Sequence, residues 1–295
     1  MNPKKDQIIT LHIPEIIDSK KVFILFIKKI YFEVARNKMP RYDERIKEAL
    51  EKIENGTPTE RSNAAIILGE YGSGKEIMEI LLKHLEEDED EFTRQDCALA
   101  LAMLEEKDAL LSLLMALKQE TSALVRNAII DTIGELGDEE NALELMEHYR
   151  FEPWDVARSS ILLALGKLRN KKAIPFLKKI IIEEEEFHLR INAMKSIIKL
   201  RGKEAVPEVI TLLKQDRRWE VRKQAAETLG YLGAAEGVEA LLFALKNDTH
   251  PFVRGEAERA IIRLSSDNRI QYTTPEDTAQ RLITLFREHK KGHKK

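Results

Sequence analysis

An arginine recurs along this chain at a nearly constant interval, and this period constrains the fold more than any other feature. The first step is 33 residues, and each later step is 32 residues. The series consists of Arg61, Arg94, Arg126, Arg158, Arg190, Arg222 and Arg254. A fixed period in this range indicates a repeat architecture, in which each unit packs against its neighbours in the chain.

Apolar residues occupy fixed positions after each arginine, and their spacing predicts two helices per repeat. Offsets 3, 7 and 10 hold Ile129, Ile133 and Leu136 after Arg126, which is the spacing of one helix face. Further apolar columns at offsets 16, 20 and 23 predict a second helix, and only Lys178 interrupts the column at offset 20. Glycine at offset 8 in four repeats is expected to mark the end of the first helix. One such helix pair cannot bury its own apolar face, so the repeats must stack.

The repeat also resembles that of a known family. The pattern V-R-x-x-A-x-x-x-L-G-x-L-G, clearest over 221–233, is joined by A-[IV]-P-x-[LV] at 173–177 and 205–209. It is similar to the short HEAT-like repeat named after phycobilisome lyases, over roughly residues 58–289. The resemblance implies an all-α, right-handed α-solenoid of about seven 32-residue helix-turn-helix repeats, with the second helices lining its concave face. Because the family includes scaffolds, chaperone-like lyases and a few enzymes, the resemblance implies no single activity.

Three regions are predicted along the chain. Residues 1–57 form an arm and a helical cap, with helices expected over 20–38 and 43–53, because the ends of a solenoid need an atypical unit. Residues 58–289 form the repeat solenoid, which follows a turn-forming cluster and has Thr57 or Thr59 as its first N-cap. Residues 290–295 form a basic tail.

Composition argues against several classes of protein. Charged residues make up 34% of the chain, yet the net charge is −3, which does not fit a general nucleic-acid binder. The apolar run 22–27 is too short for a signal-peptide core or a membrane span. The single cysteine, Cys97, lies in the small-residue column at offset 3 and is expected to be buried. We therefore expect a soluble, cytoplasmic monomer that does not enter a membrane.

No pattern of residues predicts a catalytic or metal site. None of the seven histidines is followed by glutamate, the dipeptide that holds a di-iron centre in some HEAT-like enzymes. The stretch 72–75, GSGK, lacks the spacing of a phosphate-binding loop and lies in a predicted turn between two helices. The sequence therefore favours a protein that is not an enzyme and uses no metal or cofactor.

The surface of the second helices is the predicted binding site for a protein or peptide. Offsets 18, 21 and 25 face away from the predicted core columns, and a few apolar side chains there lie among polar ones, as in many partner sites. The candidate residues are Leu82, Met115, Phe176, Phe243, Glu79, Glu144, Glu147, Lys179 and Glu208. Leu82 and Met115 share an offset and are expected to be neighbours. The alternative is a register error of one residue, which would place these side chains in the core.

The joints between repeats have a pattern of their own. Aromatic residues precede five of the first helices, at Phe92, Trp154, Phe187, Trp219 and Phe252. This placement favours hydrophobic staples that fix the entry of the chain into each helix, with a row of aromatic anchors as the alternative. Acidic runs at 86–91 and 183–186 are expected to be solvated, or to bind a basic partner. Arg126 and Arg222 are expected to hydrogen-bond between repeats, because they follow the period of the fold.

Three functions remain open. The leading hypothesis is a non-enzymatic scaffold or adaptor that binds a partner along the concave face. The resemblance leaves a second, a chromophore lyase or chaperone-like factor for a cofactor-bearing protein. The third is nucleic-acid binding through a basic edge at Arg217 and Arg218, in which Trp154 and Trp219 would stack on bases, although the net negative charge makes nucleic acid an unfavourable partner.

Overall fold

A computed structural model describes residues 40–292, which form helices and the turns between them. The chain divides into two compact units, Met1–Glu48 and Ala49–Lys295. The division falls inside the first described helix, α2 (Pro40–Asn55), which contains the helix predicted over 43–53. The helix predicted over 20–38 lies outside the described residues.

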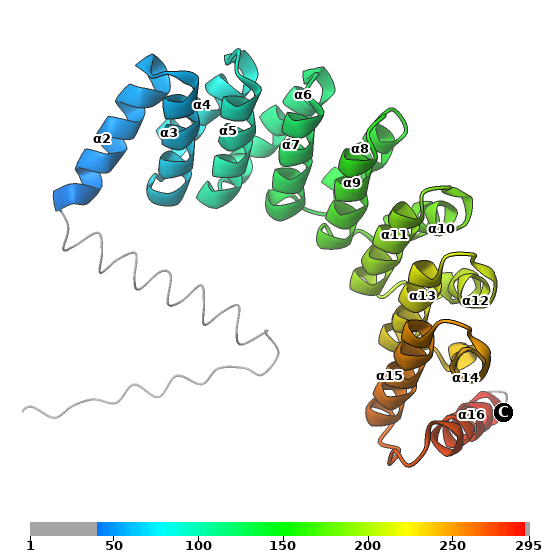
Figure 1. The fold of residues 1–295 in the computed structure, drawn as a ribbon. Helices are drawn as coiled ribbons and strands as arrows, with labels where there is room; N and C mark the ends of the chain where they lie inside the picture. The colour runs from blue at the N-terminus through cyan, green and yellow to red at the C-terminus, as the bar shows by residue number, and fades with distance from the viewer. Residues whose placement is uncertain (1–39, 293–295) are drawn as a thin grey trace, which may run out of the picture. The chain divides into compact units, whose positions relative to one another are not determined.

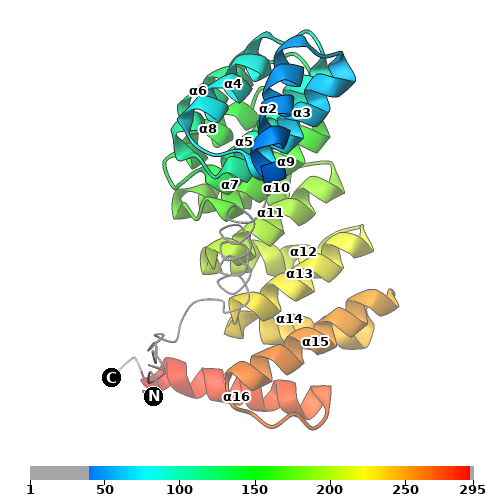
Figure 2. The same ribbon diagram turned by 90° about the vertical axis from the view of Figure 1, so that its left-hand side faces the viewer.

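Helix pairs follow one another along the second unit with the predicted period (Figure 1). The first helices are α3 (Pro58–Tyr71), α5 (Glu91–Leu104), α7 (Ala123–Leu136), α9 (Asp155–Lys167), α11 (Phe187–Leu200), α13 (Trp219–Leu232) and α15 (Pro251–Asp267). The second helices are α4 (Lys75–Glu87), α6 (Leu110–Gln119), α8 (Asn141–Tyr149), α10 (Ile174–Glu183), α12 (Val206–Gln215), α14 (Val238–Asn247) and α16 (Pro275–Gly292). Figure 2 shows the pairs from the side, with α12 beside α13 and α14 beside α15. The predicted all-α solenoid is confirmed.

Local signals set the ends of these helices. Thr57 is the N-cap of α3 and forms a capping box with Glu60, which settles the choice between Thr57 and Thr59. Single turns of 3-10 helix lead into four of the second helices: η1 (Lys107–Ala109), η2 (Lys171–Ala173), η3 (Lys203–Ala205) and η4 (Ala235–Gly237). Helix α13 ends at Gly233, whose φ of 64° is the left-handed conformation that glycine adopts readily.

The core follows the predicted columns with one correction. Offsets 3 and 7 are buried in every first helix, as at Ile129 and Ile133. In helix α4 the buried residue is Leu81 at the predicted offset 20, but in the later second helices the buried column is offset 19, with Leu113, Leu145, Leu177, Val209 and Leu241. Lys178 therefore does not interrupt the core, because Leu177 fills the column beside it. The Lys178 ammonium instead lies 2.9 Å from a Glu208 carboxylate oxygen.

Neighbouring first helices pack closely because small residues face each other. The glycines at offset 8 lie inside the last turns of their helices and do not end them. A Cβ atom at Gly134 would lie 2.9 Å from the Cβ of Ala164, and one at Gly69 would lie 2.7 Å from the Cα of Ala100. Neighbouring second helices contact each other less extensively. Their surface therefore lies on the wider side of the stack, and not on a concave face as expected.

Candidate binding grooves

Most of the recurring arginines connect two successive joints of the solenoid. Arg126 donates from Nε and Nη2 to the two carboxylate oxygens of Glu152, both at 2.8 Å, 26 residues further along the chain. Its Nη1 donates to the backbone carbonyls of Glu120 and Thr121 in the preceding joint, at 3.1 and 2.9 Å. Arg222 makes the same set of bonds. It donates to the Asp248 carboxylate in the following joint and to the backbone carbonyls of Asp216 and Arg217 in the preceding joint. The expected hydrogen bonding of these arginines between repeats is confirmed.

The carboxylates that accept these bonds form a column along the joints, and its members were not named from the sequence. They follow the second helices, at Asp88, Glu120, Glu152, Glu184, Asp216 and Asp248. Burial alone would raise the pKa of Glu152, but hydrogen bonds from Arg126 and from the Trp154 N–H outweigh it and lower this pKa. The sequence carries an acid 26 or 27 residues after each of the first six arginines, and none at that distance after Arg254.

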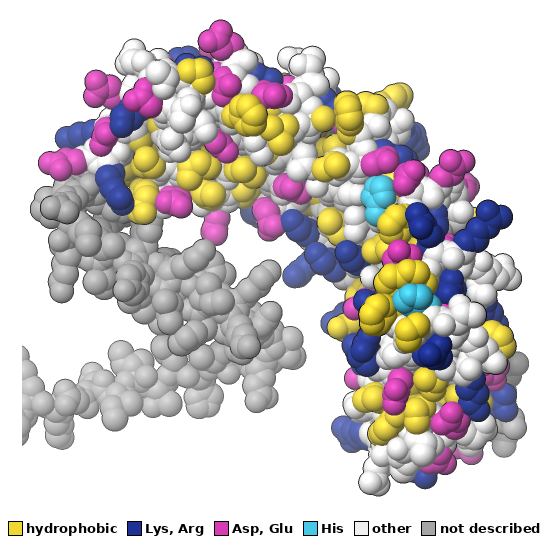
Figure 3. Space-filling view, in the orientation of Figure 1, with side chains coloured by type: hydrophobic (Ala, Val, Ile, Leu, Met, Phe, Trp, Pro, Cys, Tyr) yellow, Lys and Arg dark blue, Asp and Glu magenta, His cyan; other side chains and the backbone are white. Residues whose placement is uncertain are grey.

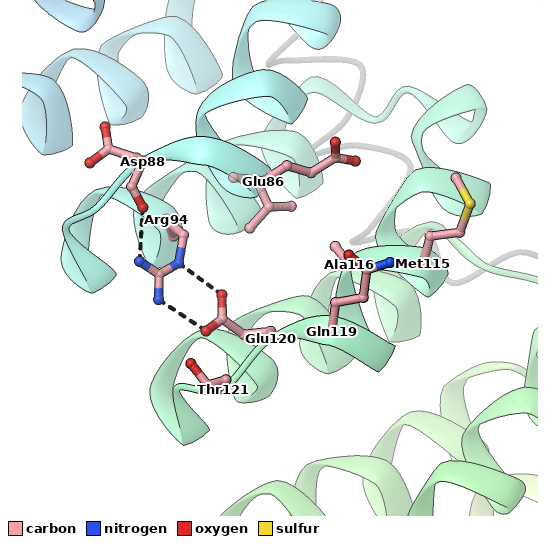
Figure 4. Close-up of a pocket in the computed structure, with 9 residues that line it drawn as sticks. Glu86, Asp88, Arg94, Met115, Ala116, Gln119, Glu120 and Thr121 are labelled. Atoms are coloured by element: carbon pink, nitrogen blue, oxygen red, sulfur yellow. Dashed lines mark hydrogen bonds and ion pairs between the residues drawn. The ribbon is translucent and has the colours of Figure 1, made fainter.

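A groove of about 560 Å³ lies between α4 and α6, beside one of these ion pairs. Arg94 and Glu120 form one end, joined by two bonds of 2.8 and 3.0 Å (Figure 4). Glu86 of α4 and Met115 of α6 line the remainder. The Met115 side chain is 48% exposed, and Leu111, one helical turn earlier, is 69% exposed. Helix α6 thus presents an apolar stripe beside this first groove.

The same groove recurs between α12 and α14, with a volume of about 300 Å³. The first groove is lined by Leu85, Glu86, Asp88, Arg94, Met115, Ala116, Gln119, Glu120 and Thr121. The second groove is lined by Leu213, Lys214, Asp216, Arg222, Phe243, Ala244, Asn247, Asp248 and Thr249. The two sets correspond position by position. Phe243, 57% exposed, replaces Met115, and Lys214 replaces Glu86, which reverses the charge of one wall.

A third groove, between α2 and α4, occupies the equivalent place with a volume of about 340 Å³ but has no exposed apolar side chain. Its lining includes Lys83 where the first groove has Met115, and the Lys83 ammonium lies 3.2 Å from Glu54. Arg61 and Arg94 are 33 residues apart, one more than the later arginines, and the extra residue lies before α4. The residue of α4 at the position equivalent to Met115 is therefore Lys83, and not Leu82. Leu82 is half-buried and does not occupy the position equivalent to Met115, as the shared offset had predicted.

The other predicted binding residues do not gather in one groove. Phe176 is half-buried and packs edge-on against Tyr149, with ring centroids 5.2 Å apart. Glu144 is exposed on α8. The remaining charged candidates form ion pairs on the second helices: Glu79 with Lys75, Glu147 with Arg150, Lys179 with Glu183 and Glu208 with Lys178. Met115 and Phe243 are therefore the two predicted residues that the structure places in grooves.

Charge divides the second unit into two halves. Residues 49–150 contain 24 Asp and Glu against 9 Lys and Arg, a net charge of −15. Residues 151–292 contain 20 Asp and Glu against 26 Lys and Arg, a net charge of +6. Figure 3 shows Lys and Arg side chains gathered over the C-terminal helices. The nearly neutral total had hidden this polarity, which a count by repeat would have found.

The described residues offer no metal centre and no membrane span. Within residues 40–292, no three His, Cys, Asp or Glu side chains are placed to hold a metal ion. None of the helices in that range is both long enough and apolar enough to cross a bilayer. Cys97 is buried as predicted, and burial raises the pKa of its thiol.

Several solved structures resemble this chain at low sequence identity, and one of them, YibA, shows the same fold. YibA of E. coli is 15% identical with a TM-score of 0.55, over 86% of this chain and 99% of that chain. The CpcE–CpcF complex of phycocyanin lyase from Nostoc is 18% identical with a TM-score of 0.48, over 81% and 94%. An archaeal HEAT-like repeats protein from Thermococcus onnurineus is 14% identical with a TM-score of 0.49, over 75% and 97%.

Comparison of the sequence with protein families gives a direct assignment. No curated protein matches the chain. The family model for HEAT repeats matches residues 46–134, 111–193 and 174–262, three overlapping segments that cover the helix pairs from α2 to α15. The chain therefore belongs to the HEAT-repeat family.

Proposed function

We propose that this protein is a non-enzymatic scaffold that binds a partner protein through the grooves between its second helices. The observation that supports this is the position of Met115 and Phe243, exposed apolar side chains at the same place in two matching grooves. A single exposed apolar residue is ordinary on a protein surface. Here each one stands beside a groove that charged and polar side chains surround, the arrangement in which a few anchor residues supply most of the binding energy.

The ion pairs favour this role because they fix the shape of both grooves. Arg94 holds Glu120 with two hydrogen bonds, and Arg222 holds Asp248 with two more, at 2.7 and 2.9 Å. A surface that is formed before binding loses less conformational freedom when the partner arrives. The two grooves lie four repeats apart, so one partner reaches both only if it is extended or carries two binding segments.

The test uses a photoreactive phenylalanine analogue placed at position 115 or 243 of the full chain. Irradiation in lysate of the source cells, followed by mass spectrometry, identifies proteins that touch these positions. Affinity is then measured with the purified partner for the wild type and for the Met115→Asp/Phe243→Asp double variant. We expect at least a tenfold loss of affinity, because a carboxylate cannot replace an apolar anchor in a desolvated pocket.

Thr211→Asp is the matched control, since Thr211 is exposed at the same offset of α12 but lines neither groove. It should bind the partner as the wild type does, and all variants should keep the wild-type circular dichroism. Equal affinity of the double variant and the wild type would show that the grooves are not the binding site. An eluate that absorbs visible light through a bound chromophore would instead support a lyase or chaperone-like factor.

A further inference from the structure

Three joints in the basic half carry a cluster of aromatic rings and cations that lies beside the second groove but shares no lining residue with it. The Trp219 and His250 rings stack with centroids 4.0 Å apart and planes at 6°. Phe252, 60% exposed, lies 5.5 Å from Trp219, measured between ring centroids. The Arg218 guanidinium lies 4.6 Å from the ring centroid of Phe187. We call Phe187, Arg217, Arg218, Trp219, His250 and Phe252 the aromatic edge.

The joint carboxylates Asp216 and Asp248 do not neutralise the arginines of the aromatic edge, because both already pair with arginines of the repeat. Asp216 pairs with Arg190 at 3.1 Å, and Asp248 accepts two bonds from Arg222. Arg217 and Arg218 are both exposed, and neither forms an ion pair with a described carboxylate. Arginine in this state is well suited to carboxylates, which its planar group binds through two parallel hydrogen bonds.

The helix ends beside the edge show a second imbalance. Arg218 is the N-cap residue of α13 and His250 that of α15, and neither helix has a side-chain cap. A cation at the N-terminus of a helix is unfavourable, since the helix dipole places partial positive charge there. The equivalent N-cap of α5 is Asp90, which accepts a hydrogen bond from the Thr93 N–H at 2.8 Å. An anionic ligand at the edge would offset the charge of Arg218.

We propose that the aromatic edge binds an acidic segment of a partner protein, in which carboxylates alternate with aromatic or aliphatic side chains. The carboxylates would pair with Arg217 and Arg218, and the apolar side chains would cover the exposed Phe252. Single-stranded nucleic acid fits less well. One face of the Trp219 ring is already covered by His250, so that face is not open to stack on a base.

The experiment measures fluorescence anisotropy with two labelled probes on the full chain. One probe is a twelve-residue peptide of alternating Asp, Glu and Phe residues, and the other is a twelve-nucleotide thymidine strand. The variants are Arg217→Glu/Arg218→Glu and the control Lys171→Glu/Lys172→Glu, which makes the same change of charge in the turn η2. Lys171 and Lys172 are exposed, and that turn lies at the opposite end of its helices from the joints.

We expect the peptide to bind the wild type and the control variant alike, and to bind Arg217→Glu/Arg218→Glu at least tenfold more weakly. The Met115→Asp/Phe243→Asp variant should bind the peptide normally, which separates this surface from the grooves. Tighter binding of the thymidine strand than of the peptide would overturn the proposal in favour of nucleic acid. Equal loss in both charge variants, or no peptide binding to the wild type, would also overturn it.

Discussion

The first and second grooves show how one structural frame presents two different surfaces. Both are lined by the same nine repeat positions, and both end at a doubly hydrogen-bonded arginine and carboxylate. They differ in volume, about 560 Å³ for the first groove and about 300 Å³ for the second. They also differ at one wall position, which is Glu86 in the first groove and Lys214 in the second. The frame is therefore set by the period of the fold, while the chemistry offered to a partner is set by two or three side chains.

The arginine–carboxylate pairs that frame both grooves should have the largest effect on stability. In Arg94–Glu120 and Arg222–Asp248 the arginine is 14% and the carboxylate 7% exposed in both pairs. Glu120→Ala and Asp248→Ala each leave a largely buried guanidinium without its partner. We expect each to lower the free energy of unfolding by about 3 kcal/mol, measured in urea.

The control for this prediction is Glu147→Ala, which removes an exposed ion pair with Arg150. It should change the free energy of unfolding by less than about 1 kcal/mol. If Glu120→Ala were harmless while Asp248→Ala unfolded the chain, the two grooves would not share a frame and the comparison would fail.

The packing of the first helices gives a smaller and asymmetric effect. A Cβ at Gly69 would lie 2.7 Å from the backbone Cα of Ala100, whereas one at Gly230 would lie 2.9 Å from the Ala260 Cβ and the Arg263 guanidinium. The nearest backbone atom at Gly230 is the Ala260 Cα at 3.0 Å, so the backbone overlap is smaller than at Gly69, and the long Arg263 side chain can rotate away. We therefore expect Gly69→Ala to cost about 1–3 kcal/mol and Gly230→Ala less, from thermal melts of the two variants. Equal losses of stability in the two variants would mean that both helix pairs move apart equally easily to admit the added methyl group.

These packing contacts show where sequence reasoning succeeds and where it stops. The period, the helix pairs and the buried columns were predictable because every repeat must solve the same burial problem, as Ile129 and Ile133 do. The prediction at offset 20 was wrong because offsets 19 and 20 are both apolar, as in Leu113 and Leu114. The apolar pattern alone cannot show which of two adjacent apolar residues is buried. The single extra residue before α4 then moved Leu82 out of register with Met115.

The grooves themselves were less predictable than the helices around them. Met115 and Phe243 were identified by their outward offset. Their setting depends on which joint carboxylate each arginine reaches, and that contact links residues 26 positions apart. Leu111 was missed because offset 17 was not taken as outward, although the structure leaves it 69% exposed. An acid at a joint predicts a solvated loop equally well, so the pairing could be read only once the helices were placed.

The loss of stability at low pH should depend on the same ion pairs. Burial opposes ionisation of Glu120 and Asp248, but hydrogen bonds from Arg94 and Arg222 prevail, and both pKa values are lowered. A lowered pKa in the folded state stabilises the protein fully above the pKa of the unfolded chain, about 4. Stability should therefore fall as the pH drops below about 4. Urea titrations from pH 6 to pH 3 should show a shallower fall for Glu120→Ala, and an unchanged slope would contradict this account.

Exchange of the wall charges should affect stability least and reveal most about specificity. Glu86 and Lys214 are exposed, so Glu86→Lys and Lys214→Glu should each change the free energy of unfolding by less than about 0.5 kcal/mol. Binding is measured with two labelled peptides, one with a leucine flanked by lysines and one with a leucine flanked by glutamates. The Lys214→Glu/Met115→Asp variant, whose first groove lacks its anchor, should prefer the lysine peptide, whereas Met115→Asp alone should prefer the glutamate peptide. If the preferred peptide differs between these two variants, charge complementarity at this wall position selects the partner. If both variants prefer the same peptide, specificity comes from the anchors Met115 and Phe243 and not from the charge beside them.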